Sequence, residues 1–227
     1  MKRTILYFVL LNLLLSNKCK NNEYDAMEVW KKHLSTIGNE NVIKDIKTVY
    51  SIETWNSKYG QRKIVSTIKY PDKLYREVIF QGDTTKYILN GVSGIISGKE
   101  TRQMNELELI DYKEIATIFP DYYIKQDNLK LLGIEKENNK EYFEFEVKLK
   151  PDFKMKYLID TTNYELYKMI SENADNSFDI EILEKEKISG INTRMKSRMM
   201  IGKDTIFYTN NLTKYNIEID NSIFKIE

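Results

Sequence analysis

The sequence predicts a mainly β protein of the α+β class, in which a curved antiparallel sheet packs against helices. Apolar residues follow a helical spacing up to about residue 37 and change to a two-residue period from Lys47. Tyr, Phe and Trp number 16, 9 and 2 against only 9 Gly and 3 Pro, a composition that favours strands with few sharp corners. Long antiparallel sheets curl, so we expect the helices to lie on a concave face.

The N-terminal segment has the features of a signal peptide. Lys2 and Arg3 supply positive charge ahead of an apolar stretch over residues 5–15, which is shorter than the roughly 20 residues of a membrane-spanning helix. No Ala-x-Ala cleavage site follows, and the chain instead reaches its single cysteine, Cys19. A leucine and a small residue shortly before a cysteine resemble the lipobox of bacterial lipoproteins, although Lys18 occupies a position where a small residue is usual.

These features divide the chain into three expected parts. Residues 1–18 are predicted to be a secretory or lipoprotein signal peptide, residues 19–25 a polar tether and residues 26–227 a single domain. Cys19 is the predicted lipidation site, through which the protein would be anchored to a membrane. The alternative is an ordinary secretory signal followed by a cysteine without that role, and it leaves the prediction of export unchanged.

The first element of the expected domain is a helix over residues 25–37. Asp25 is a suitable N-cap, and Glu28 stands three residues later, as in a capping box. Gly38 stands where a left-handed residue commonly ends a helix. A short helical turn is expected at residues 39–46. The predicted buried face of the first helix consists of Met27, Trp30, Leu34 and Ile37.

Strands make up most of the remaining sequence. Short alternating runs over residues 47–98 are separated by turn sequences, which predicts a meander of hairpins. A hairpin that turns at residues 160–163, further strands over 177–219 and a last strand at 221–227 bring the expected total to roughly nine or ten strands. The helix over residues 103–118 interrupts this series, and its predicted apolar face consists of Leu107, Ile110, Ile115 and Ile118.

Three apolar strand faces are candidates for the lining of a ligand cavity on the concave side. In "EYFEFEVKLKP" apolar and charged residues alternate, so that one face is apolar while Glu144, Glu146 and Lys148 face water. The alternative is a sealed core, which is the commoner role of an apolar strand face. The candidate lining residues are Val78, Phe80, Phe143, Phe145, Val147, Leu149, Met155, Tyr157 and Ile159.

The sequence offers little for catalysis or for charged partners. Its single histidine, His33, is expected to be a surface or packing residue, and one His with one Cys cannot form a zinc cluster. No nucleotide-binding loop occurs, so we expect a non-enzymatic protein without a cofactor. A net charge of +1 gives no electrostatic reason to expect a nucleic-acid partner. The basic residues Arg194, Lys196 and Arg198 are expected on a solvent-facing side of a strand, with contact to anionic head groups as the alternative.

Turn and packing signatures occur in an order that is similar to that of a known family. "IGNENVIKDIKTV" leads into the first strand, "YPDKLYREVIFQGDTTKYILNGVSGII" and "YLIDTTNYELYKM" follow, and "NIEIDNSIFKIE" closes the chain. In this order the chain resembles the bacterial outer-membrane lipoprotein-sorting family, the LolA/LolB-like carriers, as a remote relative. The resemblance implies an incomplete, half-open β-barrel, with helices that cover the concave face above an apolar cavity for acyl chains.

The same resemblance implies where the protein acts and what it binds. It implies an exported, periplasm-facing protein of the cell envelope, with the outer membrane as the favoured place of anchoring. Its partner would be a lipid or an acylated lipoprotein, which a carrier or receptor holds in the half-barrel. The alternative is an envelope lipoprotein that uses this fold as a structural or sensory module and docks a protein partner. Lipidation of Cys19 would favour a receptor or docking module over a soluble shuttle.

Overall fold

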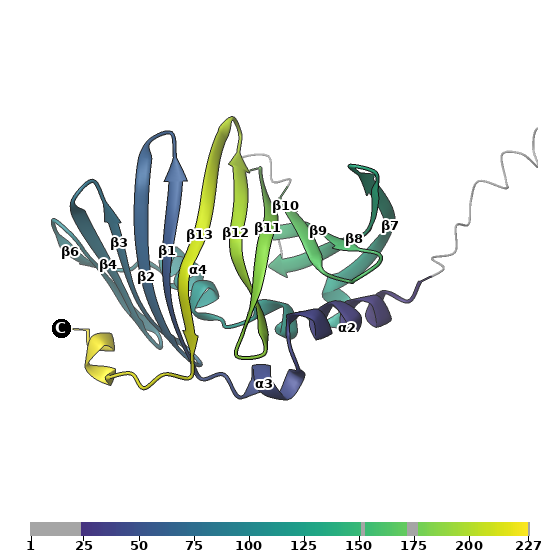
Figure 1. Cartoon of the computed structure of the whole chain (residues 1–227). Coiled ribbons are helices and arrows are strands. Elements are labelled where there is room, and N and C mark those ends of the chain that lie inside the picture. The colour runs from purple at the N-terminus through teal and green to yellow at the C-terminus, as the bar shows by residue number, and fades with distance from the viewer. Residues whose placement is uncertain (1–23, 151–152, 172–176, 227) are drawn as a thin grey trace, which may run out of the picture.

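In the computed structural model, which describes residues 24–150, 153–171 and 177–226, the chain forms a curved antiparallel sheet of 13 strands that does not close into a barrel (Figure 1). The strand order is β6-β5-β4-β3-β2-β1-β13-β12-β11-β10-β9-β8-β7, so the first and last strands of the sequence are neighbours within the sheet. Helices lie on its concave side. The predicted fold class, a half-open barrel with helices on the concave face, is therefore confirmed.

The sheet consists of two meanders, which we call the N-terminal and C-terminal wings. The strands of the N-terminal wing are β1 (Thr48–Ser57), β2 (Gly60–Lys69), β3 (Lys73–Phe80), β4 (Asp83–Asn90), β5 (Ser93–Ser97) and β6 (Thr101–Gln103). The strands of the C-terminal wing are β7 (Leu129–Glu137), β8 (Lys140–Lys150), β9 (Phe153–Asp160), β10 (Leu166–Ser171), β11 (Phe178–Ile188), β12 (Ile191–Ile201) and β13 (Asp204–Tyr215).

Short helices connect and flank the wings. Between β6 and β7 the chain passes through α4 (Glu106–Ala116) and the 3-10 turns η1 (Pro120–Tyr123) and η2 (Gln126–Asn128). Helices α2 (Ala26–Ile37) and α3 (Glu40–Lys44) precede β1, and the 3-10 turn η3 (Asn221–Phe224) follows β13. Among the described residues, no helix has the length and apolar character needed to cross a membrane.

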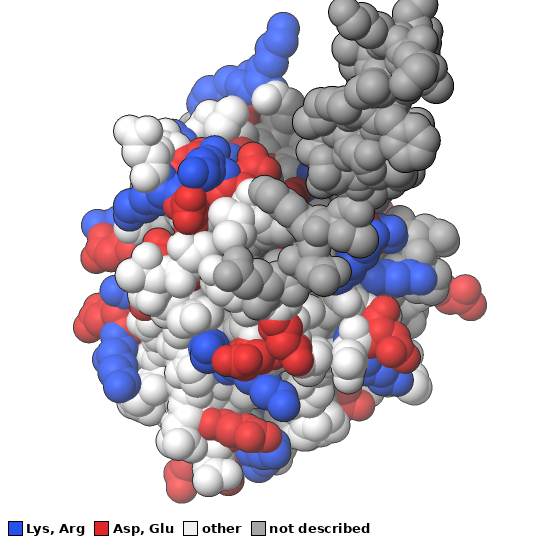
Figure 2. All heavy atoms as spheres, turned by 90° about the vertical axis from the view of Figure 1, so that its right-hand side faces the viewer, with Lys and Arg blue, Asp and Glu red and all other residues white. Residues whose placement is uncertain are grey.

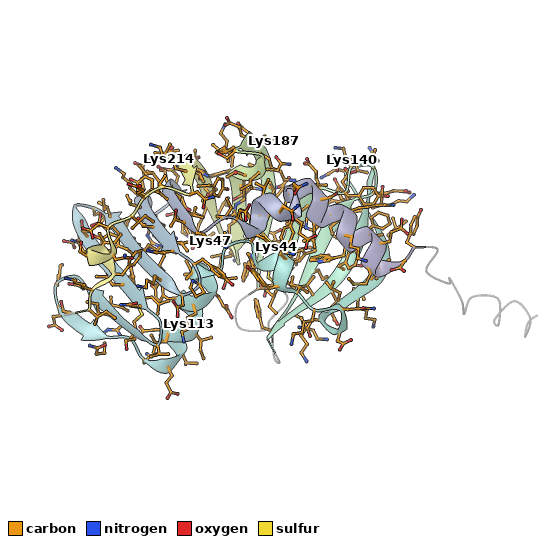
Figure 3. All side chains as sticks on the ribbon, turned by 90° about the horizontal axis from the view of Figure 1, so that it is seen from below. Lys44, Lys47, Lys113, Lys140, Lys187 and Lys214 are labelled. Carbon is orange, nitrogen blue, oxygen red and sulfur yellow. The ribbon has the colours of Figure 1, made fainter. Side chains whose placement is uncertain are left out.

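Helix α2 lies across the C-terminal wing, as the view from below shows (Figure 3). Its N-cap is confirmed, because the Asp25 carboxylate accepts hydrogen bonds from the backbone N–H groups of Met27 at 2.7 Å and Glu28 at 3.2 Å. The Glu28 carboxylate pairs with Lys32 Nζ at 2.8 Å instead of closing a capping box. Gly38 is extended, with φ of 170°, so the predicted left-handed cap was wrong.

The buried face of α2 overlaps the predicted one, because Trp30 is buried and Leu34 and Ile37 pack against the core clusters. Val29, Trp30 and His33 are buried, whereas Met27 is only half-buried. Trp30 packs on Phe145 of β8, with 5.6 Å between ring centroids. The curved surface of β8 and β9 therefore fixes the orientation of the helix, which apolar spacing alone defines only approximately.

Helix α4 covers part of the N-terminal wing. Ala116 is fully buried against Leu74 of β3 and Leu89 of β4, and the Tyr112 ring stacks on Tyr87 at 4.9 Å. The predicted apolar face of this helix was wrong, because Leu107 is 74% exposed. Two further predicted members, Ile110 and Ile115, are also exposed, whereas Ile118, just beyond the end of the helix, is buried as predicted.

The end of the chain also differs from its prediction. Residues 221–224 form the 3-10 turn η3 instead of a strand. The cause is local: the Asp220 carboxylate accepts a hydrogen bond from the Ser222 backbone N–H at 2.9 Å, which favours a tight turn. Phe224 is nevertheless fully buried, and Asn221 Oδ1 accepts a hydrogen bond from Lys69 Nζ at 2.7 Å.

Candidate functional site: a trough on the concave face

A cavity of about 410 Å³ lies between the concave face of the sheet and the segments α2 and η1. We call it the central trough. It crosses the β1–β13 pairing, where the alternation of strand residues directs Val49, Ser51 and Glu53 of β1 into the cavity. Their direct partners Tyr215 and Thr213 and, at a β-bulge, Asn210 face the same space from β13. Cavities of a few hundred Å³ are typical of sites for small ligands.

Much of the lining of the trough is apolar. The Phe119 ring of the segment before η1 lies 6.0 Å from the Tyr215 ring, and both rings line the trough. Phe119 has a left-handed backbone, with φ of 54°, which is uncommon for a bulky residue and marks a locally strained turn. The apolar and aromatic lining residues are Ile37, Val49, Ile68, Phe119, Pro120, Tyr157, Leu166, Met169, Ile182, Tyr208 and Tyr215.

A band of polar residues crosses the trough at the level of Glu53. The Glu53 carboxylate accepts hydrogen bonds from Trp55 Nε1 at 3.2 Å and Ser51 Oγ at 3.3 Å. Arg76 Nη2 lies 3.9 Å from the same carboxylate, and both side chains are mostly buried. A buried charge is tolerated when it is paired and hydrogen-bonded, so Glu53 is satisfied within the protein itself.

Arg194 enters the trough from β12. Register shifts between β11 and β12 interrupt the simple alternation of this strand. As a result Arg194 lies over the Tyr208 ring, with its guanidinium carbon 4.7 Å from the ring centroid. Burial is the main cause that raises the pKa of Tyr208 to about 12, with the Glu53 carboxylate adding to it. Tyr208 is therefore a neutral phenol at physiological pH.

His33 and Asp121 meet at the α2 side of the trough. The His33 ring is buried, and its Nδ1 lies 3.2 Å from the carbonyl oxygen of Tyr164, to which it can donate. Its Nε2 lies 3.8 Å from Asp121 Oδ2, and Tyr157 OH donates to Asp121 Oδ1 at 3.3 Å. Burial, together with the Asp121 charge, raises the pKa of Tyr157 well above its usual value. Of the two roles expected for His33, the structure shows packing.

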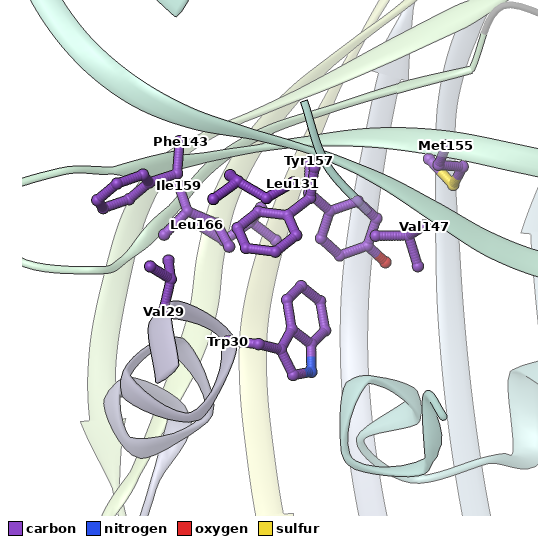
Figure 4. Close-up of a cluster of buried hydrophobic side chains, with 10 residues drawn as sticks. Val29, Trp30, Leu131, Phe143, Val147, Met155, Tyr157, Ile159 and Leu166 are labelled. Atoms are coloured by element: carbon purple, nitrogen blue, oxygen red, sulfur yellow. The ribbon is translucent and has the colours of Figure 1, made fainter. Parts of the chain in front are cut away.

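Most of the predicted lining residues lie in the core instead of the trough wall. Figure 4 shows this core, in which Trp30 and Val29 of α2 face the strands of the C-terminal wing. Tyr157 belongs to the core and also lines the trough. The core residues from the predicted set, apart from Tyr157, are Phe143, Phe145, Val147, Met155 and Ile159, each no more than 7% exposed.

The remaining predicted lining residues lie on strands outside the trough. Leu149, near the end of β8, is 38% exposed. Val78 and Phe80 on β3 are half-buried, and the Arg62 guanidinium lies 5.1 Å from the centroid of the Phe80 ring. The α2 helix separates the apolar stripe of β8 from the trough, and sequence alone does not reveal this cover.

The basic run of β12 is divided between the two faces of the sheet. Lys196 and Arg198 lie on the solvent side, as predicted, and pair with Glu184 and Glu181. Arg194 lies in the trough instead, so its predicted position on the solvent face was wrong. The physical reason is the bulge pattern of β11 and β12, which the charge spacing of "RMKSRMM" does not disclose.

The described surface carries both signs of charge. On the described part of the face shown in Figure 2, basic and acidic side chains are interspersed, and neither sign forms an extended patch. Among the residues that the structure describes, no group of three or more potential metal ligands occurs. Cys19, the predicted lipidation site, lies outside the described residues.

Comparisons with known proteins identify the fold. No protein-family model matches the sequence, and no curated protein matches it significantly. A LolA superfamily protein from Nitrosomonas europaea, NE2245, has a similar structure, with a TM-score of 0.61 and 12% identity over 89% of this chain and 98% of that chain. A DUF1329 family protein from Desulfovibrio piger has a TM-score of 0.61 and 11% identity over 88% of this chain and 97% of that chain.

A third solved structure agrees with these two. A domain from Vibrio parahaemolyticus, assigned to the outer membrane lipoprotein-sorting proteins, has a TM-score of 0.60 and 10% identity over 88% of this chain and 97% of that chain. Identities this low establish similarity of fold alone. The resemblance seen in the sequence is thus confirmed at that level, and the chain has the fold of the LolA superfamily protein and of the outer membrane lipoprotein-sorting domain.

Proposed function

We propose that this protein binds a lipid, or the acyl chains of a lipoprotein, in the central trough and acts as a carrier or receptor of the cell envelope. The observation that carries the proposal is a cavity of about 410 Å³ with a largely apolar lining, on the concave face of a LolA-type half-barrel. Each methylene group removed from water contributes about 0.8 kcal/mol, so one chain in this trough gains substantial affinity. Nothing in this role requires catalysis or a cofactor.

The N-terminal sequence supports a place for the protein in the envelope. We propose that residues 1–18 direct export, that residues 19–25 form a tether and that residues 26–227 act as one periplasm-facing domain. Lipidation of Cys19 would hold this domain at a membrane, with the outer membrane favoured, and would suit a LolB-like receptor better than a soluble shuttle.

Filling the trough tests the proposal. Ser51 is half-buried and lines the trough, so Ser51→Trp places an indole where the ligand would lie. We expect this variant to lose binding of a fluorescent fatty acid such as cis-parinaric acid. Tyr50→Trp is the matched control, because Tyr50 alternates with Ser51 on the same strand and faces the other side of the sheet.

Melting temperatures of both variants accompany the binding assay. A folded Ser51→Trp protein without probe binding, beside a Tyr50→Trp protein that binds normally, supports the trough as the site. Equal binding by both variants places the ligand elsewhere. Wild-type protein that binds no acyl probe at any concentration rejects the lipid proposal and leaves the protein-docking role in its place.

A further inference from the structure

The charged side chains of the trough differ in how well they are paired within the protein. Glu53 is satisfied by Trp55, Ser51 and the nearby Arg76. Lys185 Nζ pairs with Glu165 Oε2 at 2.9 Å. These groups therefore offer little net charge to a ligand.

Among the Lys and Arg residues that line the trough, Arg194 is the exception. Its guanidinium contacts the face of Tyr208, and among the described residues it forms no ion pair with a carboxylate. The two other basic residues of the run, Lys196 and Arg198, each have an acidic partner on the opposite side of the sheet. Arg194 also interacts with the neutral Tyr208 hydroxyl, but a half-buried guanidinium has several N–H donors, and those not used in this contact stay available for an anion.

The surroundings hold Arg194 in position. Asn210 Nδ2 lies 3.4 Å from the backbone oxygen of Arg194 and donates to Thr213 Oγ1 at 2.6 Å. Asn210 Oδ1 in turn accepts from the backbone N–H of Leu212 at 3.1 Å, within the β13 bulge. These hydrogen bonds tie the backbone of Arg194 to the β13 bulge, and the contact with the Tyr208 ring restrains its side chain, so its donors lose less entropy when they bind a ligand.

We infer that the trough takes a single-chain amphiphile with an anionic head, and that Arg194 binds this head group while the apolar lining covers the chain. This inference rests on the proposed function and adds the class of head group. Arginine presents several N–H donors in a planar fork, which suits both carboxylate and phosphate oxygens. The volume of about 410 Å³ favours one chain over a molecule with several.

A pair of probes that differ only in the head group tests the inference. Wild-type protein is expected to bind cis-parinaric acid about tenfold more tightly than its methyl ester, since a charge-assisted hydrogen bond contributes about that factor. Arg194→Gln is expected to remove this preference by weakening binding of the acid, with binding of the ester unchanged. Arg194→Lys should restore part of the preference.

Controls separate this inference from folding effects and from the proposed function. Arg198→Gln, on the solvent side of the same strand, should leave both affinities unchanged, and the melting temperature shows whether Arg194→Gln is folded. Equal binding of acid and ester by wild-type protein rejects the anionic head but keeps the lipid site. Failure to bind either probe rejects the lipid site as well.

Inorganic phosphate distinguishes a free anion from a lipid head group. Because the inferred ligand owes much of its affinity to its chain, phosphate alone should neither displace the probe nor raise the melting temperature of the wild type. Stabilisation by phosphate that disappears in Arg194→Gln would show that a free anion suffices, and it would overturn the inference of an amphiphile.

Discussion

Phe145 and Tyr157 occupy directly paired positions of β8 and β9, yet they have different roles. Phe145 is fully buried beneath Trp30, whereas Tyr157 contacts the same indole and also extends its hydroxyl towards Asp121 at the wall of the trough. Of two side chains paired across neighbouring strands, one therefore lies wholly in the core while the other also forms part of the cavity wall. The consequence is that substitutions at these sites should have different effects on stability and on binding.

Phe145 is expected to be a determinant of stability. Phe145→Ala removes a fully buried ring from the core and should lower the free energy of unfolding by about 3–5 kcal/mol, measured by urea denaturation. Glu144→Gln is the control on the opposite face of the strand, where Glu144 pairs with Lys156 at 3.2 Å, and it should change stability by less than about 1 kcal/mol. A fully stable Phe145→Ala protein that has lost ligand binding would instead place Phe145 in the cavity wall.

Sequence predicts these residues only in part. The alternation around Phe143, Phe145 and Val147 fixes which side of β8 is apolar, and the structure agrees. It does not show whether a helix or a ligand covers that side, because the cover comes from α2, more than a hundred residues away. Arg194 is harder still to predict, since the bulges that turn it inwards depend on pairing with neighbouring strands.

At the scale of elements, α4 shows how a helix can be positioned by its surroundings. Apolar residues occur around its whole circumference, so their spacing does not select a buried face. Its start is fixed instead by a capping box, in which Asn105 and Glu108 exchange hydrogen bonds between side chain and backbone. The segment just before the helix, at Met104, lies close to Gly94 of β5, and this close packing brings Leu109 onto the sheet.

Gly94 is expected to be required for this close approach. A Cβ atom there would collide with Met104 Sδ and would lie 3.1 Å from Leu109 and 3.2 Å from the Ile88 carbonyl oxygen. Gly94→Ala should therefore lower the free energy of unfolding by about 1–3 kcal/mol through overpacking. Gly98→Ala, with nothing nearer than 3.5 Å, is the matched control and should be tolerated. Equal stability of the two variants, measured by thermal denaturation, would contradict the proposed packing.

The capping interaction of α4 predicts that the stability of the protein depends on pH. The Arg102 guanidinium, helped by the Asn105 backbone N–H, lowers the pKa of Glu108 from 4.5 to about 2. The folded state binds a proton at the Glu108 carboxyl less tightly than the unfolded state does. The stabilisation that this carboxylate gives to the folded state is therefore complete above about pH 4.5 and is lost as the pH falls towards 2. The melting temperatures of wild type and Glu108→Gln should therefore differ at pH 6 and converge on acidification.

Glu106→Gln, two residues earlier in the same turn of the helix, serves as the control for that experiment. It removes a negative charge from the same end of the helix without breaking the Arg102 pair. If its difference from wild type follows the same pH course as that of Glu108→Gln, the effect belongs to general charge and not to the capping interaction.

Strands are the elements that sequence predicts best here. The two-residue period identifies the hairpins of the N-terminal wing and the long strands from β8 onwards. It does not reveal β6, which has 3 residues, or β7, in which a bulge between Leu131 and Gly133 breaks the alternation. The sheet therefore has 13 strands, against an expected total of roughly nine or ten.

For the whole molecule, the prediction concerns attachment to a membrane through Cys19. Cys19→Ser is expected to move the protein from the membrane fraction to the soluble fraction, because several acyl chains on a lipoprotein cysteine bind a bilayer firmly. Metabolic labelling with palmitate should mark the wild type and not the variant. Unchanged retention of the variant, or a wild type without label, would leave an ordinary secretory signal as the explanation of residues 1–18.

The architecture of the whole molecule could be predicted in outline, whereas the trough could not. Order and type of elements sufficed to indicate a curved antiparallel sheet over helices, and the family resemblance added the half-open barrel. The position and polarity of the trough depend on how α2 and Phe119 close over the seam between the wings, which is a matter of tertiary packing.

The central pairing of β1 with β13 has a kinetic consequence. Hairpins of each wing close short loops, whereas the hydrogen bond between the Lys47 backbone N–H and Asn216 Oδ1 joins residues 169 positions apart. Contacts of such high sequence separation form slowly, because their loop entropy must be offset before they contribute stability. Each wing can therefore assemble early, while the trough exists only after the last strand has docked on the first. Ligand-binding competence should appear only in the slowest phase of folding.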